Sequence, residues 1–109
     1  MKVSGFRAMW LLVLFDLPVR TKPQRKRASE FRKRLLTDGF TMMQYSVYMR
    51  PCPSEENAVV HLQRVQKALP SLGSIRIMQI TDKQFGRMRC FDGKQAVSTE
   101  EMPHQLEFF

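Results

Sequence analysis

The feature that most restricts the fold of this chain is an uninterrupted apolar run near its start, from Ala8 to Phe15. Apolar residues in this run do not alternate with polar ones, which is typical of a strand that is covered on both faces. The run is shorter than the ~20 residues that a helix needs to cross a bilayer. We therefore predict a central β-strand over residues 9–15 and no membrane span.

The residues around this run also argue against secretion. Basic residues precede it, as in a signal peptide, but Asp16-Leu17-Pro18 stands where small residues would mark a cleavage site. Cys52 and Cys90 form neither a disulfide framework nor paired zinc-ligand spacing, and His61 and His104 do not complete a zinc site. We therefore expect a cytoplasmic protein in a reducing compartment.

A helix is predicted from about Lys22 to Asp38. Thr21 and Gln24 have the spacing of a capping box, and Gly39 can take the left-handed conformation that ends many helices. The apolar positions of this segment recur on one helix face, and they are Ala28, Phe31 and Leu35.

The remaining elements follow from similar signals. Residues 43–50 alternate between apolar and polar, which predicts a strand or a bent pair of strands that ends at the prolines 51 and 53. Ser54 can cap a second helix. Its predicted buried residues are Ala58, Leu62, Val65 and Leu69. Residues 75–80 are predicted to form another strand, and residues 88–91 could form a short one.

This order of elements predicts the fold class. In 109 residues it suits an α+β, ferredoxin-like (split β-α-β) fold, with two helices on one face of a small antiparallel sheet and the other face bare. We expect a ferredoxin-like domain over residues 1–93. A C-terminal tail over residues 94–109 is expected to add an extra C-terminal strand.

The positive charge of the chain is concentrated in one segment. The chain has 18 Lys and Arg against 10 Asp and Glu, a formal net charge of +8, and eight of the basic residues lie between positions 20 and 34. They are Arg20, Lys22, Arg25, Lys26, Arg27, Arg32, Lys33 and Arg34. Glu30 is the only acid among them, although opposite-charge pairs at i, i+4 would have been easy to place. We predict that these residues bind nucleic-acid phosphates, the alternative being a solvated helix face.

Asp16 is the candidate for chemistry. It is the only acid among the first 29 residues and follows the apolar run, at the strand end where functional groups are common. Mg²⁺ needs only one or two protein carboxylates, so two copies of Asp16 that meet across a twofold axis could hold it. Alternatively, Asp16 caps the following turn or accepts a hydrogen bond from a neighbouring Arg.

Four segments of the chain together resemble one protein family. They read Phe15-Asp16-Leu17-Pro18, Phe31-Arg32-Lys33, Gln44-Tyr45-Ser46-Val47-Tyr48 and Thr81-Asp82-Lys83-Gln84-Phe85. In this order they are similar to the smaller of the two universal CRISPR-associated (Cas) adaptation proteins, in the branch that accompanies type II systems. The similarity covers nearly the whole chain.

The resemblance implies a ferredoxin-like homodimer that binds duplex DNA and bridges two dimers of the CRISPR integrase, which then inserts the DNA as a new spacer. Catalysis of insertion would belong to that partner. The family is also named for a metal-dependent endoribonuclease activity, with the acid after the first strand as metal ligand, and Asp16 occupies that position. The favoured expectation is a DNA-holding adaptor; the alternative is a Mg²⁺-dependent endonuclease that hydrolyses RNA or DNA through Asp16 of each protomer.

Two further expectations depend partly on the resemblance. The split fold requires a fourth strand, which arises either from a bend near Tyr45-Ser46 or over residues 88–91. The apolar end of the chain is predicted to dock as a strand on the other protomer or on the integrase, the alternative being a frayed terminus. The residues expected to make this contact are Leu106, Phe108 and Phe109.

Overall fold

The computed structural model describes residues 7–103 and contains a four-stranded antiparallel sheet in the order β2-β3-β1-β4. The elements of this domain are β1 (Met9–Asp16), α1 (Lys22–Thr37), β2 (Thr41–Gln44), β3 (Val47–Cys52), α2 (Glu55–Lys67) and β4 (Ser74–Thr81). This arrangement confirms the ferredoxin-like prediction. Across residues 7–103, no helix is long and apolar enough to span a membrane.

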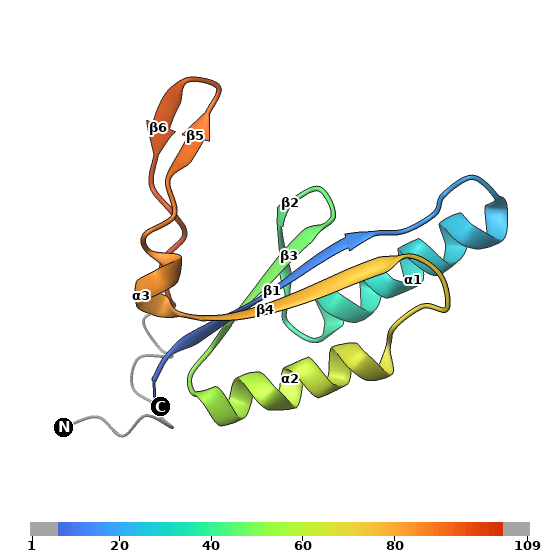
Figure 1. Cartoon of the computed structure of the whole chain (residues 1–109), viewed down its shortest axis with the longest axis horizontal. Coiled ribbons are helices and arrows are strands. Elements are labelled where there is room, and N and C mark those ends of the chain that lie inside the picture. The colour runs from blue at the N-terminus through green and yellow to red at the C-terminus, as the bar shows by residue number, and fades with distance from the viewer. Residues whose placement is uncertain (1–6, 104–109) are drawn as a thin grey trace.

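β1 is a central strand, as its apolar composition predicts, with β3 on one side and β4 on the other. Figure 1 shows α1 and α2 together on one side of the strands. The alternate side chains of β1 that face these helices are buried, and they are Met9, Leu11, Val13 and Phe15. They pack against the predicted apolar face of α1, formed by Ala28, Phe31 and Leu35.

Both ends of α1 are fixed by the predicted signals. Thr21 Oγ1 accepts a hydrogen bond from the backbone N–H of Gln24 (3.2 Å), and Gln24 Oε1 accepts one from the N–H of Thr21 (3.0 Å). At the other end Gly39 has a φ of +86°. The next N–H, that of Phe40, donates to the carbonyl of Leu35 at 3.0 Å, as in a Schellman motif.

The fourth strand comes from the bend at Tyr45-Ser46, which joins β2 to β3 as a hairpin with Gln44 opposite Val47. The sequence had also allowed residues 88–91. The expectation that proline ends this strand at position 51 is wrong, because Pro51 lies within β3 and pairs with Trp10 of β1. β2 begins opposite Met49, so among residues 7–103 no strand pairs with this edge of β3 at Pro51, and proline is tolerated there.

α2 begins at the predicted cap, where Ser54 Oγ accepts a hydrogen bond from the N–H of Asn57 at 3.0 Å. Its buried face differs from the predicted one at three positions. Leu62 is only partly buried. Leu69 is 46% exposed, because the helix ends at Lys67 and the helical period does not continue beyond it. His61, which was not predicted to be buried, is 5% exposed and lies on the buried face instead.

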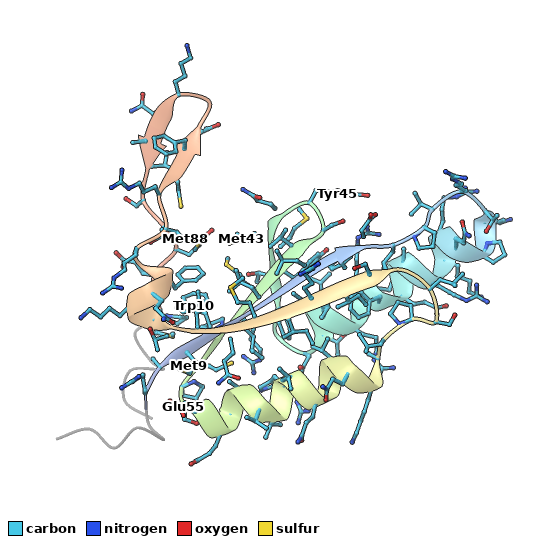
Figure 2. The ribbon with its side chains drawn as sticks, in the orientation of Figure 1. Met9, Trp10, Met43, Tyr45, Glu55 and Met88 are labelled. Atoms are coloured by element: carbon cyan, nitrogen blue, oxygen red, sulfur yellow. The ribbon has the colours of Figure 1, made fainter. Side chains whose placement is uncertain are left out.

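The sheet face away from α1 and α2 is not bare, which corrects the expectation from the sequence. The one-turn helix α3 (Asp82–Phe85) covers one end of this face. Figure 2 shows Trp10 beside α3, and its ring stacks on Phe85 with the centroids 3.9 Å apart. The second cluster of buried residues comprises Trp10, Leu12, Met49, Phe85 and Met102. At this end the sheet face is therefore covered by the Trp10–Phe85 stack and by the segment around Met102, and not by a layer of helices.

β5 (Cys90–Asp92) and β6 (Gln95–Val97) form a separate hairpin that extends away from the sheet (Figure 1). The radius of gyration, 15.1 Å, accordingly exceeds the ~13 Å typical of a compact domain of this length. The predicted domain boundary at residue 93 coincides with the turn of this hairpin, and the division into two parts stays a prediction. The expected C-terminal docking strand, with Leu106, Phe108 and Phe109, lies outside the described residues.

Candidate nucleic-acid interface

Asp16 ends β1, opposite Ser74 of β4. Because successive side chains of a strand point to opposite faces, Asp16 lies on the face away from α1, whereas Phe15 packs edge-on against Phe31 of α1. Asp16 is exposed, and among residues 7–103 no side chain forms a hydrogen bond or ion pair with its carboxylate. The structure therefore does not support the alternative in which Asp16 caps the following turn or accepts a hydrogen bond from a neighbouring Arg.

The backbone at Asp16 is held closely by the loop before β4. Gly73 has a φ of +103°, and a Cβ atom there would lie 2.6 Å from Leu17 Cδ2 and 2.9 Å from the carbonyl oxygen of Asp16. Only glycine combines this conformation with this close approach. The position of Asp16 is thus fixed by the fold, although no side chain of residues 7–103 pairs with its carboxylate.

One chain offers a poor metal site at this position. In the part of the chain that the structure describes, no three His, Cys, Asp or Glu side chains lie together as a metal-binding group. Mg²⁺ bound by one carboxylate would keep most of its ligands as water. A second Asp16, from another copy of the chain, is what this site would need to hold Mg²⁺.

The predicted basic residues lie along α1 and the loop before it. Seven of them are exposed, and they are Arg20, Lys22, Arg25, Lys26, Arg27, Lys33 and Arg34. Arg25 is also bound to the loop, because its Nη1 donates to the carbonyls of Val19 (3.2 Å) and Arg20 (3.1 Å). The other six make no side-chain hydrogen bond within residues 7–103, so their charges face solvent unpaired.

Two hollows extend this surface from α1 towards α2. One, of about 540 Å³, is lined by Arg27, Lys33 and Arg34 and by the segment after α2. The other, of about 300 Å³, lies between the two helices and adds Arg64 and Lys67 of α2. Sequence reasoning did not assign these two residues to the surface. Their place in the last turn of a helix is a common structural preference, so it gave no specific signal.

Arg32 differs from the other basic residues, because it is half-buried between two aromatic rings. Its Cζ lies 5.6 Å from the ring centroid of Phe15 and 5.3 Å from that of Tyr45. Its Nη2 also donates to the hydroxyl of Tyr45 at 3.4 Å. The guanidinium is therefore engaged in cation–π contacts, and the sequence gave no sign of them.

The sequence also did not predict a partly buried polar network at the C-terminal end of α1. His61 Nδ1 lies 2.8 Å from Asp38 Oδ2, and His61 Nε2 lies 2.8 Å from Arg50 Nη2. Because a guanidinium can only donate, Nε2 accepts and Nδ1 carries the proton that it donates to Asp38. Arg64 Nη1 donates to the other oxygen of Asp38 at 2.8 Å. These bonds join α1, β3 and α2 beside the basic surface.

Two groups in or beside this network have shifted pKa values. Burial raises the pKa of Asp38, but hydrogen bonds from His61 and Arg64 outweigh burial and hold that pKa below its usual range. Burial raises the pKa of the Cys52 thiol to about 11. Cys52 is therefore protonated at neutral pH and is a poor nucleophile.

The fold and these surfaces define a class of small ferredoxin-like proteins with a strongly basic first helix and one exposed carboxylate at the end of the first strand. The chain belongs to the CRISPR associated protein Cas2 family, whose model matches residues 9–88. This confirms the family that the four sequence segments indicated.

Several curated relatives support this membership over nearly the whole chain. A protein of Flavobacterium psychrophilum is 54% identical over 108 residues, which cover 99% of this chain and 94% of the relative. A protein of Parvibaculum lavamentivorans is 50% identical over 101 residues, covering 93% of this chain and 100% of the relative. Both relatives are named CRISPR-associated endoribonuclease Cas2.

Proposed function

We propose that this protein is a CRISPR adaptation subunit: a homodimer that binds duplex DNA and bridges integrase dimers, so that new spacers are inserted into the CRISPR array. Membership in the Cas2 family supports a role in a CRISPR system. The observation that carries the DNA-binding part is the row of exposed cations on α1, which Lys67 and the Asp38-bound Arg64 of α2 continue. Such a surface suits phosphates and carries no base-specific readout.

A second copy of the chain is the proposed cover for the sheet face that α1 and α2 leave open. Beyond the area that α3 covers, this face presents two apolar side chains. Leu14 is half-buried, and Met78 is 47% exposed. Within residues 7–103, the outer edge of β4 pairs with no strand. Asp16 lies on the same face, so a twofold contact there would bring two Asp16 carboxylates towards each other.

The C-terminal tail is proposed to contact a neighbouring subunit. Leu106, Phe108 and Phe109 make this end of the chain apolar, and an added strand gains backbone hydrogen bonds as well as side-chain contacts. The integrase is the proposed partner, and catalysis of insertion is proposed to belong to it. Arg and Lys on this chain would hold the DNA while the partner acts.

The DNA-binding proposal is tested by the salt dependence of binding to a duplex. Lys22, Lys26 and Lys33 suit replacement by Gln, because they are exposed and hold no part of the fold. If each contacts one phosphate, the triple variant should flatten the slope of log K against log[salt] by up to about 2.7. Scrambling the sequence of the duplex should change neither slope.

A matched control removes the same charge from the β5–β6 region. Arg87, Arg89 and Lys94 are exposed there, and their triple Gln variant should keep the wild-type slope. Equal slopes for the wild type and the α1 variant would remove α1 from the DNA surface. Equal flattening by both variants would mean that only net charge matters.

The alternative function is a Mg²⁺-dependent endonuclease that hydrolyses RNA or DNA. The name that these relatives share, endoribonuclease, favours this function, as does the exposed carboxylate of Asp16. Paired Asp16 residues would hold Mg²⁺, which when bound supplies a more acidic water and offsets negative charge on the phosphate. The basic surface of each protomer would bind the substrate backbone.

Asp16→Asn separates the two functions, since the amide keeps the shape and removes the charge. We expect Mg²⁺-dependent cleavage to be lost while spacer insertion by the reconstituted complex continues. Asp92→Asn, a change to an exposed acid of the hairpin, should affect neither activity. If Asp16→Asn stopped insertion while the dimer and its integrase contacts persisted, Asp16 would have a direct role in insertion, contrary to the adaptor proposal.

A further inference from the structure

Tyr45 is the most exposed aromatic residue in the described part of the chain, at 77%. It lies at the turn between β2 and β3 (Figure 2). A tyrosine ring has a large apolar face and a polar hydroxyl, so a ring that is held at the surface offers that face to a ligand. Neither DNA backbone binding nor Mg²⁺ binding uses it.

The ring is held in place despite its exposure. Arg32 lies against it at 5.3 Å from Cζ to the ring centroid, and Arg32 Nη2 donates to its hydroxyl at 3.4 Å. The turn is tied to the end of β1, where the N–H of Phe15 donates to the carbonyl of Ser46 at 3.0 Å. Ser46 has a φ of +62°, a conformation that non-glycine residues rarely adopt and that clusters at functional sites.

The charged side chain that contacts the ring is basic. Arg32 extends from α1. Arg25 lies on the same side of this helix, seven positions earlier and about 10 Å away along the helix axis. Arg32 itself is half-buried between Tyr45 and Phe15, so it supports the ring more than it offers a free charge. A fixed aromatic ring beside a row of cations is the combination that binds unpaired nucleotides, with the base on the ring and the backbone on the cations.

We propose that Tyr45 is a stacking platform for one unpaired nucleobase, with Arg32 as the residue that positions it. The ligand is a nucleic acid in which a single-stranded nucleotide adjoins the duplex on α1. This inference rests on the proposed function, because it requires nucleic acid along α1. It adds a distinction that phosphate contacts cannot make, namely between paired and unpaired ends.

The test compares two DNA probes with the full-length protein. One is a blunt duplex, and the other has the same duplex followed by five unpaired nucleotides that include 2-aminopurine, whose fluorescence is quenched by stacking. Base–aromatic stacking is worth about 1–3 kcal/mol, so Tyr45→Ala should weaken binding of the tailed probe by about 5- to 150-fold. Binding of the blunt probe and the salt slope should not change, because no phosphate contact is lost.

Two further variants keep the proposal falsifiable. Tyr45→Phe should retain the affinity and the quenching, since it keeps the ring. Arg32→Lys should retain the charge but reduce the quenching, since it loses the planar group that supports the ring. Phe91→Ala, which removes an exposed ring on the hairpin, should leave both probes unaffected.

Each other outcome overturns the inference. Unchanged binding and quenching of the tailed probe by Tyr45→Ala would mean that no base stacks on this ring. An equal loss for both probes would mean that Tyr45 contacts the duplex, and a loss of the homodimer would mean that it contacts protein. If the wild-type protein bound neither probe, the proposed function itself would fail. If Tyr45→Ala did not weaken binding of the tailed probe while the α1 Lys variant still weakened binding of both probes, the proposed function would hold without this inference.

Discussion

Replacement of Phe85 by Ala probes whether the aromatic stack under α3 is a second core. Phe85 is fully buried, and its ring stacks on Trp10 at 3.9 Å between centroids with the planes 9° apart. Trp10 Nε1 donates to Asp82 Oδ1 at 2.8 Å, so α3 is held by both a stack and a hydrogen bond. The substitution removes the stack and leaves a cavity beside Trp10.

The magnitude follows from the burial. A buried Phe→Ala change costs about 3–5 kcal/mol, of which about 0.5–1.5 kcal/mol is the aromatic pair itself. This is a large part of the ~5–15 kcal/mol stability of an ordinary domain. With a urea slope near 1.5 kcal/mol/M, the midpoint of unfolding should fall by roughly 2–3 M.

The assay uses the fact that Trp10 is the only tryptophan of the chain. Its emission in the native protein reports on the contact with α3, and Phe85→Ala should shift that emission to the red as well as lower the urea midpoint. Phe85→Leu, which keeps most of the apolar volume, should cost less than half as much. An unchanged midpoint and emission in Phe85→Ala would refute the reasoning, because α3 would then contribute no packing to Trp10.

Two further predictions concern ionisation. Asp38 has a lowered pKa in the folded state, so its contribution to stability is present above its unfolded pKa of 3.8 and is lost as the pH falls through the lower folded pKa. Urea midpoints measured from pH 5 to pH 2 should therefore fall more steeply for the wild type than for Asp38→Asn. Parallel curves for the two proteins would contradict this prediction. Cys52 has a pKa of about 11 and should react with a thiol reagent at pH 8 only as fast as the protein unfolds, whereas the half-buried Cys90 should react first. Comparison of the Cys52→Ser and Cys90→Ser variants identifies which cysteine gives each kinetic phase. A fast phase that persists in Cys90→Ser would count against a buried Cys52.

The segment Thr81 to Phe85 shows how a family motif acquires a physical meaning. Thr81 Oγ1 accepts from the N–H of Gln84 at 3.1 Å, and Gln84 Oε1 accepts from the N–H of Thr81 at 2.9 Å, which forms a capping box. Asp82 and Phe85 then bind Trp10. The motif therefore serves packing on the open sheet face, a role that the resemblance did not indicate.

Sequence alone determined the elements whose signals are local. The apolar run of β1, the capping box at Thr21 and the glycine at position 39 each act over a few neighbouring residues, so a reader of the sequence can recognise them. The basic segment was equally readable, because its eight charges lie close together between positions 20 and 34. Asp16 could be placed at the end of β1 because it directly follows the apolar run, which is also a local signal.

Tertiary structure alone decided the features that join distant parts of the chain. The Trp10–Asp82 hydrogen bond spans 72 positions and the His61–Asp38 bond spans 23, and no local pattern specifies either one. Whether a polar side chain such as His61 is buried depends on which partners the fold brings within reach, since burial without them would be costly. The exposed ring of Tyr45 on Arg32 has the same origin, because packing of α1 on the sheet is what brings the two side chains together.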